Sequence, residues 1–279
     1  GDNTSKVTKY DNPNRTLTDP YEGQQLGEIW GYVVDGYFKT DEEARNYKVD
    51  QSFVNQMINA SALDNGLHAG DLKFVDLDGN NKIEQTTSAN DRKDMKVIGN
   101  SLPRYNYNFG ISADWYGIDF SVLFQGIGKQ NWYPGAETSM FWGPYSRPYA
   151  SFIPSDFMSQ VWSEENTDAY FPRPRGYVAL GSNRELAVVN TKYLQNLAYC
   201  RLKNLSIGYT LPDKWLSKIG FEKIRVYFSG ENLLTFTKLH SDYIDPEQAS
   251  ASNSWKTSKS DANIYPWAKT YSFGVDITF

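Results

Sequence analysis

Apolar and polar residues alternate strictly over several segments in the second half of the chain. Every second residue from Tyr105 to Trp115 is apolar, and a tight turn at Tyr116-Gly117 leads into a second alternating run that starts at Ile118. Successive side chains of a β-strand point to opposite faces of a sheet, so a period of two predicts strands. The two runs and the turn between them predict a β-hairpin.

Three further segments follow the same period. They cover residues 196–211, 224–236 and 269–279, and the last is the run YSFGVDITF with Tyr271, Phe273, Val275, Ile277 and Phe279 on one face. The sequence therefore predicts about five strands of roughly ten residues, a length that spans a bilayer obliquely.

The connections between these strands alternate between short and long. Residues 116–117 and 212–222 are short links, whereas residues 127–192 and 239–267 are long, polar and rich in Gly, Pro, Ser, Trp and Tyr. Outer-membrane barrels have short periplasmic turns and long extracellular loops. We therefore expect residues 103–279 to be an all-β, antiparallel transmembrane β-barrel segment, an incomplete barrel with two long extracellular loops. A soluble β-sandwich or water-soluble barrel stays open, because its strands also alternate.

Residues 1–102 are predicted to form a small extracellular region of mixed α/β structure. GEIWGYVVDGYF (residues 27–38) predicts a strand pair, and TDEEARNYK (residues 40–48) and QSFVNQMINAS (residues 51–61) predict two short helices. The first of these helices begins at Thr40 as a capping residue, with Glu43 three positions later, as in a capping box.

Charge and cysteine content narrow the class of protein. The chain has 28 Lys and Arg against 33 Asp and Glu, a net charge of −5, so it lacks the basic surface that nucleic acid requires. The single cysteine, Cys200, excludes an internal disulfide framework and a cysteine metal cluster. The sequence has no run of 18 apolar residues, so it predicts no transmembrane helix.

One segment, DLDGNNKIE, has the ligand spacing of a calcium loop. In such loops, oxygen ligands come from alternate positions, one of them a backbone carbonyl. The residues at these positions are Asp76, Asp78, Asn80, Lys82 (through its carbonyl) and Glu84.

Two positions of this loop depart from the pattern. The sixth is Asn81 where Gly is usual, and the twelfth is Thr87 where a carboxylate is expected. Asn tolerates the left-handed backbone that the sixth position needs, and Asp91 or Asp94 could supply the carboxylate. Bound Ca²⁺ would stiffen an extracellular loop; the alternative is an ordinary Asp- and Asn-rich surface turn.

The sequence contains no recognisable catalytic motif. His68 and His240 are the only histidines, and neither belongs to a metalloprotease or hydrolase signature. Carboxylate pairs such as Glu164-Glu165 are typical of a solvated surface, although two glycosidase carboxylates need only spatial proximity. The sequence therefore does not predict an enzyme.

Aromatic residues crowd the first long connection, in NWYPG, MFWGPYSRPY and YFPRPRGY. Aromatic faces beside arginines suit stacking on sugar rings or contact with another protein. The alternatives are that the rings pack the loop on itself or form a girdle at the membrane interface. The candidate substrate-binding residues are Trp132, Tyr133, Trp142, Tyr145, Arg147 and Tyr149.

Several stretches together resemble one family. EGQQLGEIWGYVVDGYFKTDEEA, GDLKFVDLDGNNKIE, IGNSLPRYNYNFGISADWYGIDFSVLFQGIGK, YLQNLAYCRLKNLSIGYTLP, IRVYFSGENLLTFTK and YPWAKTYSFGVDITF look like the carboxyl-terminal portion of SusC/RagA-type TonB-dependent outer-membrane transporters of Bacteroidetes. The resemblance runs from about residue 22 to the last residue, and the motifs occur in the family's order.

This resemblance implies a barrel of about 22 strands in the outer membrane. It implies import of oligosaccharides or peptides with a SusD-like surface lipoprotein, driven by TonB through a plug that these 279 residues do not include. In the family, Gly usually stands where this chain has Asn81. A competing hypothesis is a secreted carbohydrate-binding β-module that stacks sugars on Trp132 and Trp142, and a third is an extracellular hydrolase with two facing carboxylates.

Overall fold

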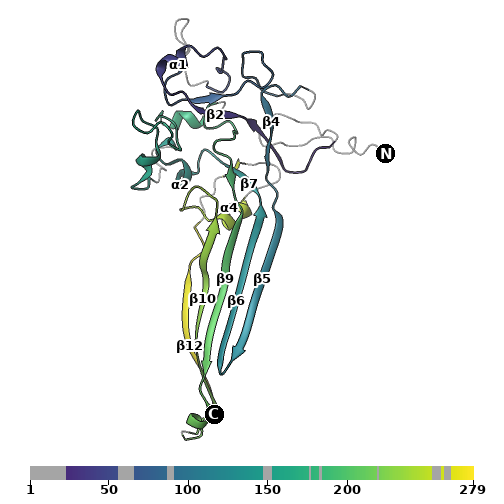
Figure 1. The fold of residues 1–279 in the computed structure, drawn as a ribbon, viewed down its shortest axis with the longest axis vertical. Coiled ribbons are helices and arrows are strands. Elements are labelled where there is room, and N and C mark those ends of the chain that lie inside the picture. The colour runs from purple at the N-terminus through teal and green to yellow at the C-terminus, as the bar shows by residue number, and fades with distance from the viewer. Residues whose placement is uncertain are drawn as a thin grey trace, which may run out of the picture.

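A single antiparallel sheet of five long strands dominates the computed structural model (Figure 1). The structure describes residues 23–55, 66–86, 91–146, 153–175, 177–181, 184–218, 220–252, 259–260 and 265–279. In spatial order the strands are β12 (Thr270–Thr278), β10 (Lys223–Thr237), β9 (Tyr199–Thr210), β6 (Ile118–Lys129) and β5 (Arg104–Trp115). All five strands that alternation predicts are present, each paired with its neighbours in chain order.

The register across the sheet aligns side chains of one kind in rows. Alternate residues of each strand share a face, so a row of directly paired residues lies wholly on one face. One apolar row consists of Ala113, Phe120, Ile207, Phe228 and Phe273. The adjacent row on the opposite face is entirely serine: Ser112, Ser121, Ser206, Ser229 and Ser272.

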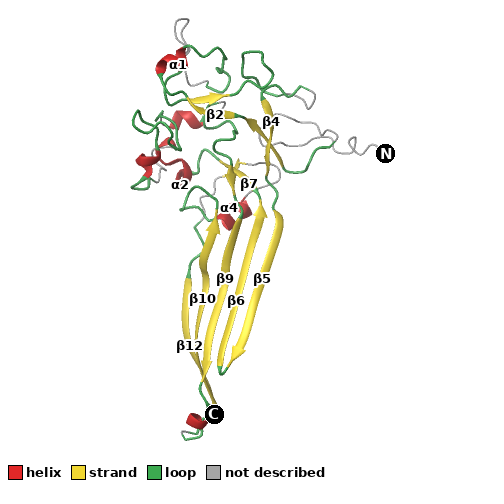
Figure 2. Ribbon diagram, viewed as in Figure 1, coloured by secondary structure: helices red, strands yellow, loops and turns green. Residues whose placement is uncertain are grey.

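The apolar face of the sheet is open. Phe109 is 50% exposed, Ile111 60% and Phe273 83%, and no other described element covers them (Figure 2). A β-sandwich or soluble barrel would bury this face in a core, so the soluble alternative is wrong for these strands. The expectation of an antiparallel, unclosed barrel segment is confirmed.

Short links lie at one end of the sheet and long connections at the other, as Figure 1 shows. Tyr116 and Gly117 have φ angles of 49° and 83°, the left-handed conformations of the tight turn that matches strand twist. A Cβ atom on Gly117 would lie 2.8 Å from the carbonyl oxygen of Thr210, which explains the glycine. The other short link contains helix α3 (Asp213–Leu216).

A charged contact on the polar face joins β6, β10 and β12 and passes over β9. The Arg225 guanidinium on β10 donates two hydrogen bonds to Asp119 on β6, of 2.7 and 2.6 Å. It also donates one of 3.1 Å to Asp276 on β12. Gly208 of β9 lies between β10 and β6, where an added Cβ would meet Arg225 Nε at 2.6 Å, so the absence of a side chain there lets Arg225 reach Asp119.

Small sheets lie beyond the long-connection end of the five strands. The predicted strand pair in residues 27–38 is wrong in its pairing, because only Val33 separates β1 from β2 and leaves no room for a turn between them. Each strand instead pairs with a segment far along the chain. The pairs are β1 (Glu28–Tyr32) with β4 (Met95–Asn100), β2 (Val34–Tyr37) with β3 (Leu72–Phe74), and β7 (Asn131–Pro134) with both β8 (Gln195–Asn196) and β11 (Lys259–Ser260).

The described helices are short. Helix α1 (Asp41–Arg45) begins as predicted, with the Thr40 hydroxyl accepting a 3.1 Å hydrogen bond from the Glu43 amide. The helix predicted over residues 51–61 is absent from residues 51–55, and residues 56–61 lie outside the described chain. The remaining helices are α2 (Ser139–Trp142), α4 (Pro246–Ser252) and three 3₁₀ turns at Gly143–Tyr145, Phe157–Gln160 and Tyr177–Leu180.

One hydrophobic core joins the amino-terminal region to both long connections. Trp30 and Phe74, Trp142 and Phe171, and Ile244 are buried in the same cluster. The loops therefore form one packed subdomain at the end of the sheet. Among the described helices, none has the length and apolar character needed to cross a bilayer.

Candidate functional site

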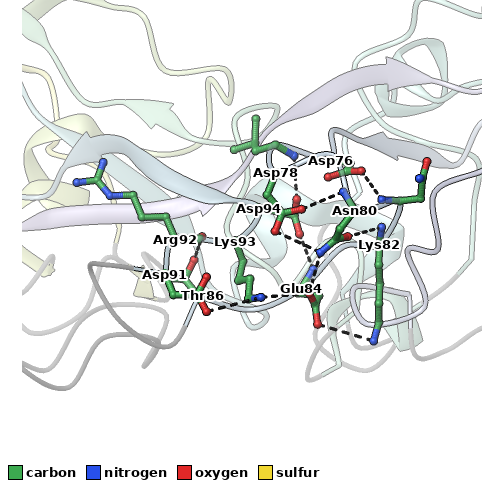
Figure 3. A network of polar contacts seen from close by, with 12 residues as sticks. Asp76, Asp78, Asn80, Lys82, Glu84, Thr86, Asp91, Arg92, Lys93 and Asp94 are labelled. Carbon is green, nitrogen blue, oxygen red and sulfur yellow. Dashed lines mark hydrogen bonds and ion pairs between the residues drawn. The ribbon is translucent and has the colours of Figure 1, made fainter.

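The loop DLDGNNKIE folds around the carboxylate of Asp76 (Figure 3). Its two oxygens accept hydrogen bonds from the amides of Gly79 and Asn81, each 2.7 Å long. Asn81 has a φ of 62°, the left-handed conformation that this position requires and that Asn tolerates. Burial opposes ionisation of Asp76, but the amide donors, Asn81 first, outweigh it and lower the pKa of this carboxyl.

Asp94 completes the cluster from a position ten residues beyond the loop. Its fully buried carboxylate accepts the amides of Leu77 (2.8 Å) and Glu84 (2.7 Å). Oxygens of Asp76, Asp78 and Asp94 lie within 4.8 Å of one another. Burial, reinforced by the charges of Asp78 and Asp76, raises the pKa of Asp94, so the three carboxylates repel one another unless a cation lies among them.

The other predicted ligands lie on the same loop. The Asn80 side-chain oxygen accepts the Lys82 amide at 2.8 Å, and the Glu84 carboxylate accepts a 3.0 Å hydrogen bond from Asn80. Lys93 Nζ lies 3.6 Å from both Glu84 and Asp91. Asp91 is therefore part of an ion pair with Lys93. Of the two candidates for the missing carboxylate, Asp94 is the one that joins the cluster.

This donor set fits Ca²⁺. Calcium takes six to eight oxygen ligands in a flexible arrangement, and the loop offers carboxylate, amide and carbonyl oxygens. The residues that would hold the ion are Asp76, Asp78, Asn80, Lys82 through its carbonyl, Glu84 and Asp94. Bound Ca²⁺ would neutralise the crowded carboxylates and tie the loop to the segment that leads into β4.

The aromatic residues predicted to bind substrate lie in the core. Trp132, Tyr133, Trp142 and Tyr145 are each at most 1% exposed. The Tyr133 hydroxyl donates to the Leu186 carbonyl at 2.8 Å, and the Trp142 indole donates to the Gly135 carbonyl at 3.0 Å. Their faces are therefore covered by protein, as in the alternative of a self-packed loop, and offer no stacking platform. Arg147 and Tyr149 lie outside the described residues.

A buried charge cluster on β9 was not found from the sequence. Arg201 is 1% exposed and binds Asp245 and Glu247, and Lys203 donates hydrogen bonds of 3.0 and 2.9 Å to the Glu247 carboxylate. Asp245 and Glu247 are therefore part of an ion-pair cluster. The sequence offered one signal for this cluster, namely two cations on a predicted strand and two anions on a loop 44 residues away. Spacing alone does not indicate that they are in contact.

A second buried group, Glu185, lies under the aromatic core. It is fully buried, and neither of its oxygens has a hydrogen-bond partner among the described residues. The nearest cation, Arg175, lies 4.0 Å away and forms its shorter ion pair with Asp71. Burial, with the adjacent charge of Asp71, raises the pKa of Glu185 to about 8, so this position favours the protonated carboxyl.

Curated relatives of this chain are TonB-dependent receptors. The chain is 28% identical over 264 residues to TonB-dependent receptor P3 of Formosa agariphila, covering 92% of this chain and 22% of the relative. It is 26% identical over 283 residues to receptor P39 of the same organism, covering 92% of this chain and 25% of that protein. The chain thus spans about a quarter of the length of the relatives it matches. No family model matches it.

Solved structures with the same fold carry the name RagAB. The structure of the RagAB peptide transporter matches with a TM-score of 0.57 at 19% identity, over 98% of this chain and 24% of that one. The RagAB peptide importer in its closed-closed state matches with a TM-score of 0.55 at 20% identity, over 98% and 25%. The resemblance to SusC/RagA-type TonB-dependent transporters is confirmed by these relatives and this fold.

Proposed function

Since this chain resembles TonB-dependent receptors in sequence and RagAB in fold, we propose that it forms part of an outer-membrane transporter that imports oligosaccharides or peptides. The chain supplies five strands of the barrel wall and part of the outer face. The observation that carries this proposal is the open antiparallel sheet, with an exposed apolar face and a polar face, in a chain that aligns over 92% of its length with a TonB-dependent receptor.

The two faces suit a wall between lipid and an aqueous lumen. Outer-membrane strands alternate between lipid-facing apolar and lumen-facing polar residues. The row that includes Phe228 and Phe273 would face lipid, and the serine row with the Arg225–Asp119 contact would face the lumen. The packed loops would then face the outside of the cell, because they lie at the end opposite the short links.

The partners follow from the same proposal. A SusD-like surface lipoprotein would contact the packed loops, and TonB would act through a plug outside these 279 residues. Ca²⁺ bound by Asp76, Asp78 and Asp94 would stiffen the outer face. We propose no catalytic role, and the burial of Trp132 and Trp142 speaks against a secreted module that stacks sugars on these rings.

Import is tested in the bacterium that carries the full-length gene. The gene is deleted and then restored as wild type. Uptake of fluorescent oligosaccharide and peptide pools is then measured with and without TonB, after membrane fractionation has placed the protein. We expect uptake of one pool that requires both the gene and TonB. Uptake of both pools unchanged by gene deletion would overturn the proposal.

A further inference from the structure

The second long connection folds back onto one face of the five-stranded sheet. Its residues 239–249, which we call the strap, lead into helix α4, and Figure 1 shows α4 at the long-connection end of β9. The strap contacts Arg201, which pairs with Gln125 of β6. The register between β5 and β6 is constant, so β6 alternates without a break and Gln125 points to the same face as Asp119. Arg201 therefore points to the polar face, and the strap lies over that face.

Ion pairs attach the strap to the polar face. Arg201 lies 2.6 Å from Asp245 and 2.8 Å from Glu247, and Lys203 lies 2.9 Å from Glu247. Arg201 is only 1% exposed. Separating a buried ion pair is strongly unfavourable, because each charge then lacks its partner. These contacts therefore hold the strap against the wall.

Contacts with the first long connection hold the strap from its other side. The His240 ring stacks on Tyr170 with centroids 3.5 Å apart, and the Ser241 hydroxyl donates a 2.9 Å hydrogen bond to the Met140 carbonyl. Ile244 is 4% exposed and belongs to the core that packs both long connections. The strap is therefore fixed between the wall and this core.

The strap covers only the outer end of the polar face. Tyr199, two residues before Arg201 and on the same face, is 4% exposed. Asn204 and Glu231, which pair with each other nearer to the short links, are exposed. A helix with its side chains is about 10 Å thick, so α4 fills about that depth in front of the outer end of β9 and leaves the wall beyond it open.

We propose that the strap narrows the outer opening of the import path and limits the width of the molecules that reach the lumen below it. The inference rests on the import function proposed above, in which the polar face lines the lumen and the long connections lie outside the cell. Linear chains pass the strap more easily than branched or folded ones. A wider molecule reaches the wall at Glu231 only when the ion pairs break and the strap moves away. The residues that set this limit are Arg201, Lys203, Asp245 and Glu247.

The test measures how reagents of two sizes reach a cysteine below the strap, in intact cells that carry the full-length transporter. Glu231→Cys supplies this reporter, after Cys200 and the other cysteines of the full-length protein are replaced by alanine. The reagents are added outside the cells and are N-ethylmaleimide and a maleimide on a long polyethylene glycol chain. We expect the small reagent to label the reporter and the large one to label it much more slowly. Glu164→Cys, at an exposed position on the first connection, should react readily with both.

Releasing the strap should admit the large reagent without changing the rate of the small one. Asp245→Asn with Glu247→Gln removes both anions and keeps the Asp245 acceptor for the amides of α4. We expect the large reagent to label Glu231→Cys at least about ten-fold faster in this variant, because opening of the strap no longer breaks an ion pair. Arg201→Met with Lys203→Met, which removes the cations instead, should have the same effect.

A matched variant separates the strap from overall charge. Glu164→Gln with Glu165→Gln also removes two anions, both exposed on the first connection, and should leave the rates of both reagents at Glu231→Cys unchanged. An acceleration of the large reagent as great as in the release variants would overturn the proposal.

The reporter itself gives the other decisive outcomes. Equal labelling by the two reagents in wild type, or a rate of the large reagent that stays the same in both release variants, would overturn the proposal. Failure of the small reagent to label Glu231→Cys would overturn it as well, because the wall below the strap would then be closed to the outside. TonB-dependent uptake of one substrate pool is measured separately and would still support import in any of these cases, so failure of the strap and failure of the transport function are distinguishable.

Discussion

Arg201 of β9 and Asp245, immediately before helix α4, form a buried ion pair with 2.6 Å between Nη2 and Oδ2. The same guanidinium lies 2.8 Å from Glu247 and 3.0 Å from the Thr235 hydroxyl. The other oxygen of Asp245 accepts the amides of Glu247 and Gln248 at the start of α4. One arginine of the barrel wall thus holds the second long connection in place.

Removing either partner should loosen this connection. Asp245→Asn keeps an oxygen for the amides of α4 but removes the charge, and we expect a loss of about 1–3 kcal/mol in the free energy of unfolding. Arg201→Met leaves two carboxylates without their guanidinium and should cost about 3–5 kcal/mol.

Hydrogen exchange of residues 246–252 in the full-length protein measures the local effect. Lys214→Met, at an exposed position on α3, should change stability by less than about 0.5 kcal/mol. Unchanged exchange in both variants would mean that other contacts hold the connection.

Calcium should stabilise the outer subdomain. At a concentration 100 times the dissociation constant, the ion adds about 2.7 kcal/mol to the free energy of unfolding. Asp78→Asn, which keeps an acceptor for the Asn80 amide, should weaken binding at least about ten-fold, because a carboxylate ligand is lost. Terbium luminescence and thermal unfolding with Ca²⁺ or EDTA measure the effect, and Asp91→Asn, outside the three-carboxylate cluster, is the control. Identical melting with Ca²⁺ and EDTA would rule out the site.

Glu185 should make the stability of the subdomain depend on pH. Its pKa is raised from an ordinary value of 4.5 to about 8, so between these values the folded state holds a proton that the unfolded chain releases. The contribution of Glu185 to the free energy of unfolding is therefore greatest below about pH 4.5. It falls by up to about 1.4 kcal/mol per pH unit as the pH rises to 8.

Denaturant unfolding between pH 5 and pH 8 tests this slope. Glu185→Gln should flatten it, because an amide neither gains nor loses a proton in this range. Glu164→Gln, at an exposed position on the same connection, should leave it unchanged. A slope that is the same in wild type and Glu185→Gln would assign the pH dependence to other groups.

Neighbouring residues on β12 should respond oppositely to a charge. Phe273→Arg places a cation on the apolar face and should cost about 2–4 kcal/mol if that residue lies near the bilayer midplane. Ser272→Arg places the same cation on the polar face and should cost much less. Unfolding of the full-length protein in lipid vesicles compares the two variants. Equal costs would contradict the assignment of the apolar face to lipid.

Local patterns in the sequence predicted the strands well, because alternation is a property of consecutive residues. For this reason the sequence predicted the turn at Tyr116-Gly117 and the links of the five-stranded sheet. It could not predict how the strands of the outer subdomain pair. β1 pairs with β4, more than 60 residues away, and alternation within residues 27–38 says nothing about so distant a partner.

The candidate sites divide in the same way. The turn over residues 76–84 was predictable because its polar residues lie within nine positions, and the fold adds that the buried Asp94, not Asp91, joins its carboxylates. Calcium binding by this cluster stays a prediction. Trp132 and Trp142 were misplaced because composition gives the number of aromatic rings but not which of them face water.

Gly208, under the Arg225 side chain, affects the register in which the strands of the sheet pair. Alternation is preserved when one strand slides past its neighbour by two residues, so the faces of the sheet do not by themselves specify alignment. Arg225 reaches Asp119 only across Gly208, and a slide of two residues would bring Ser206 or Thr210 into its way and separate the charges. The ion pair across Gly208 therefore favours one register of β6, β9 and β10. It disfavours registers shifted by two residues, which keep the same apolar and polar faces.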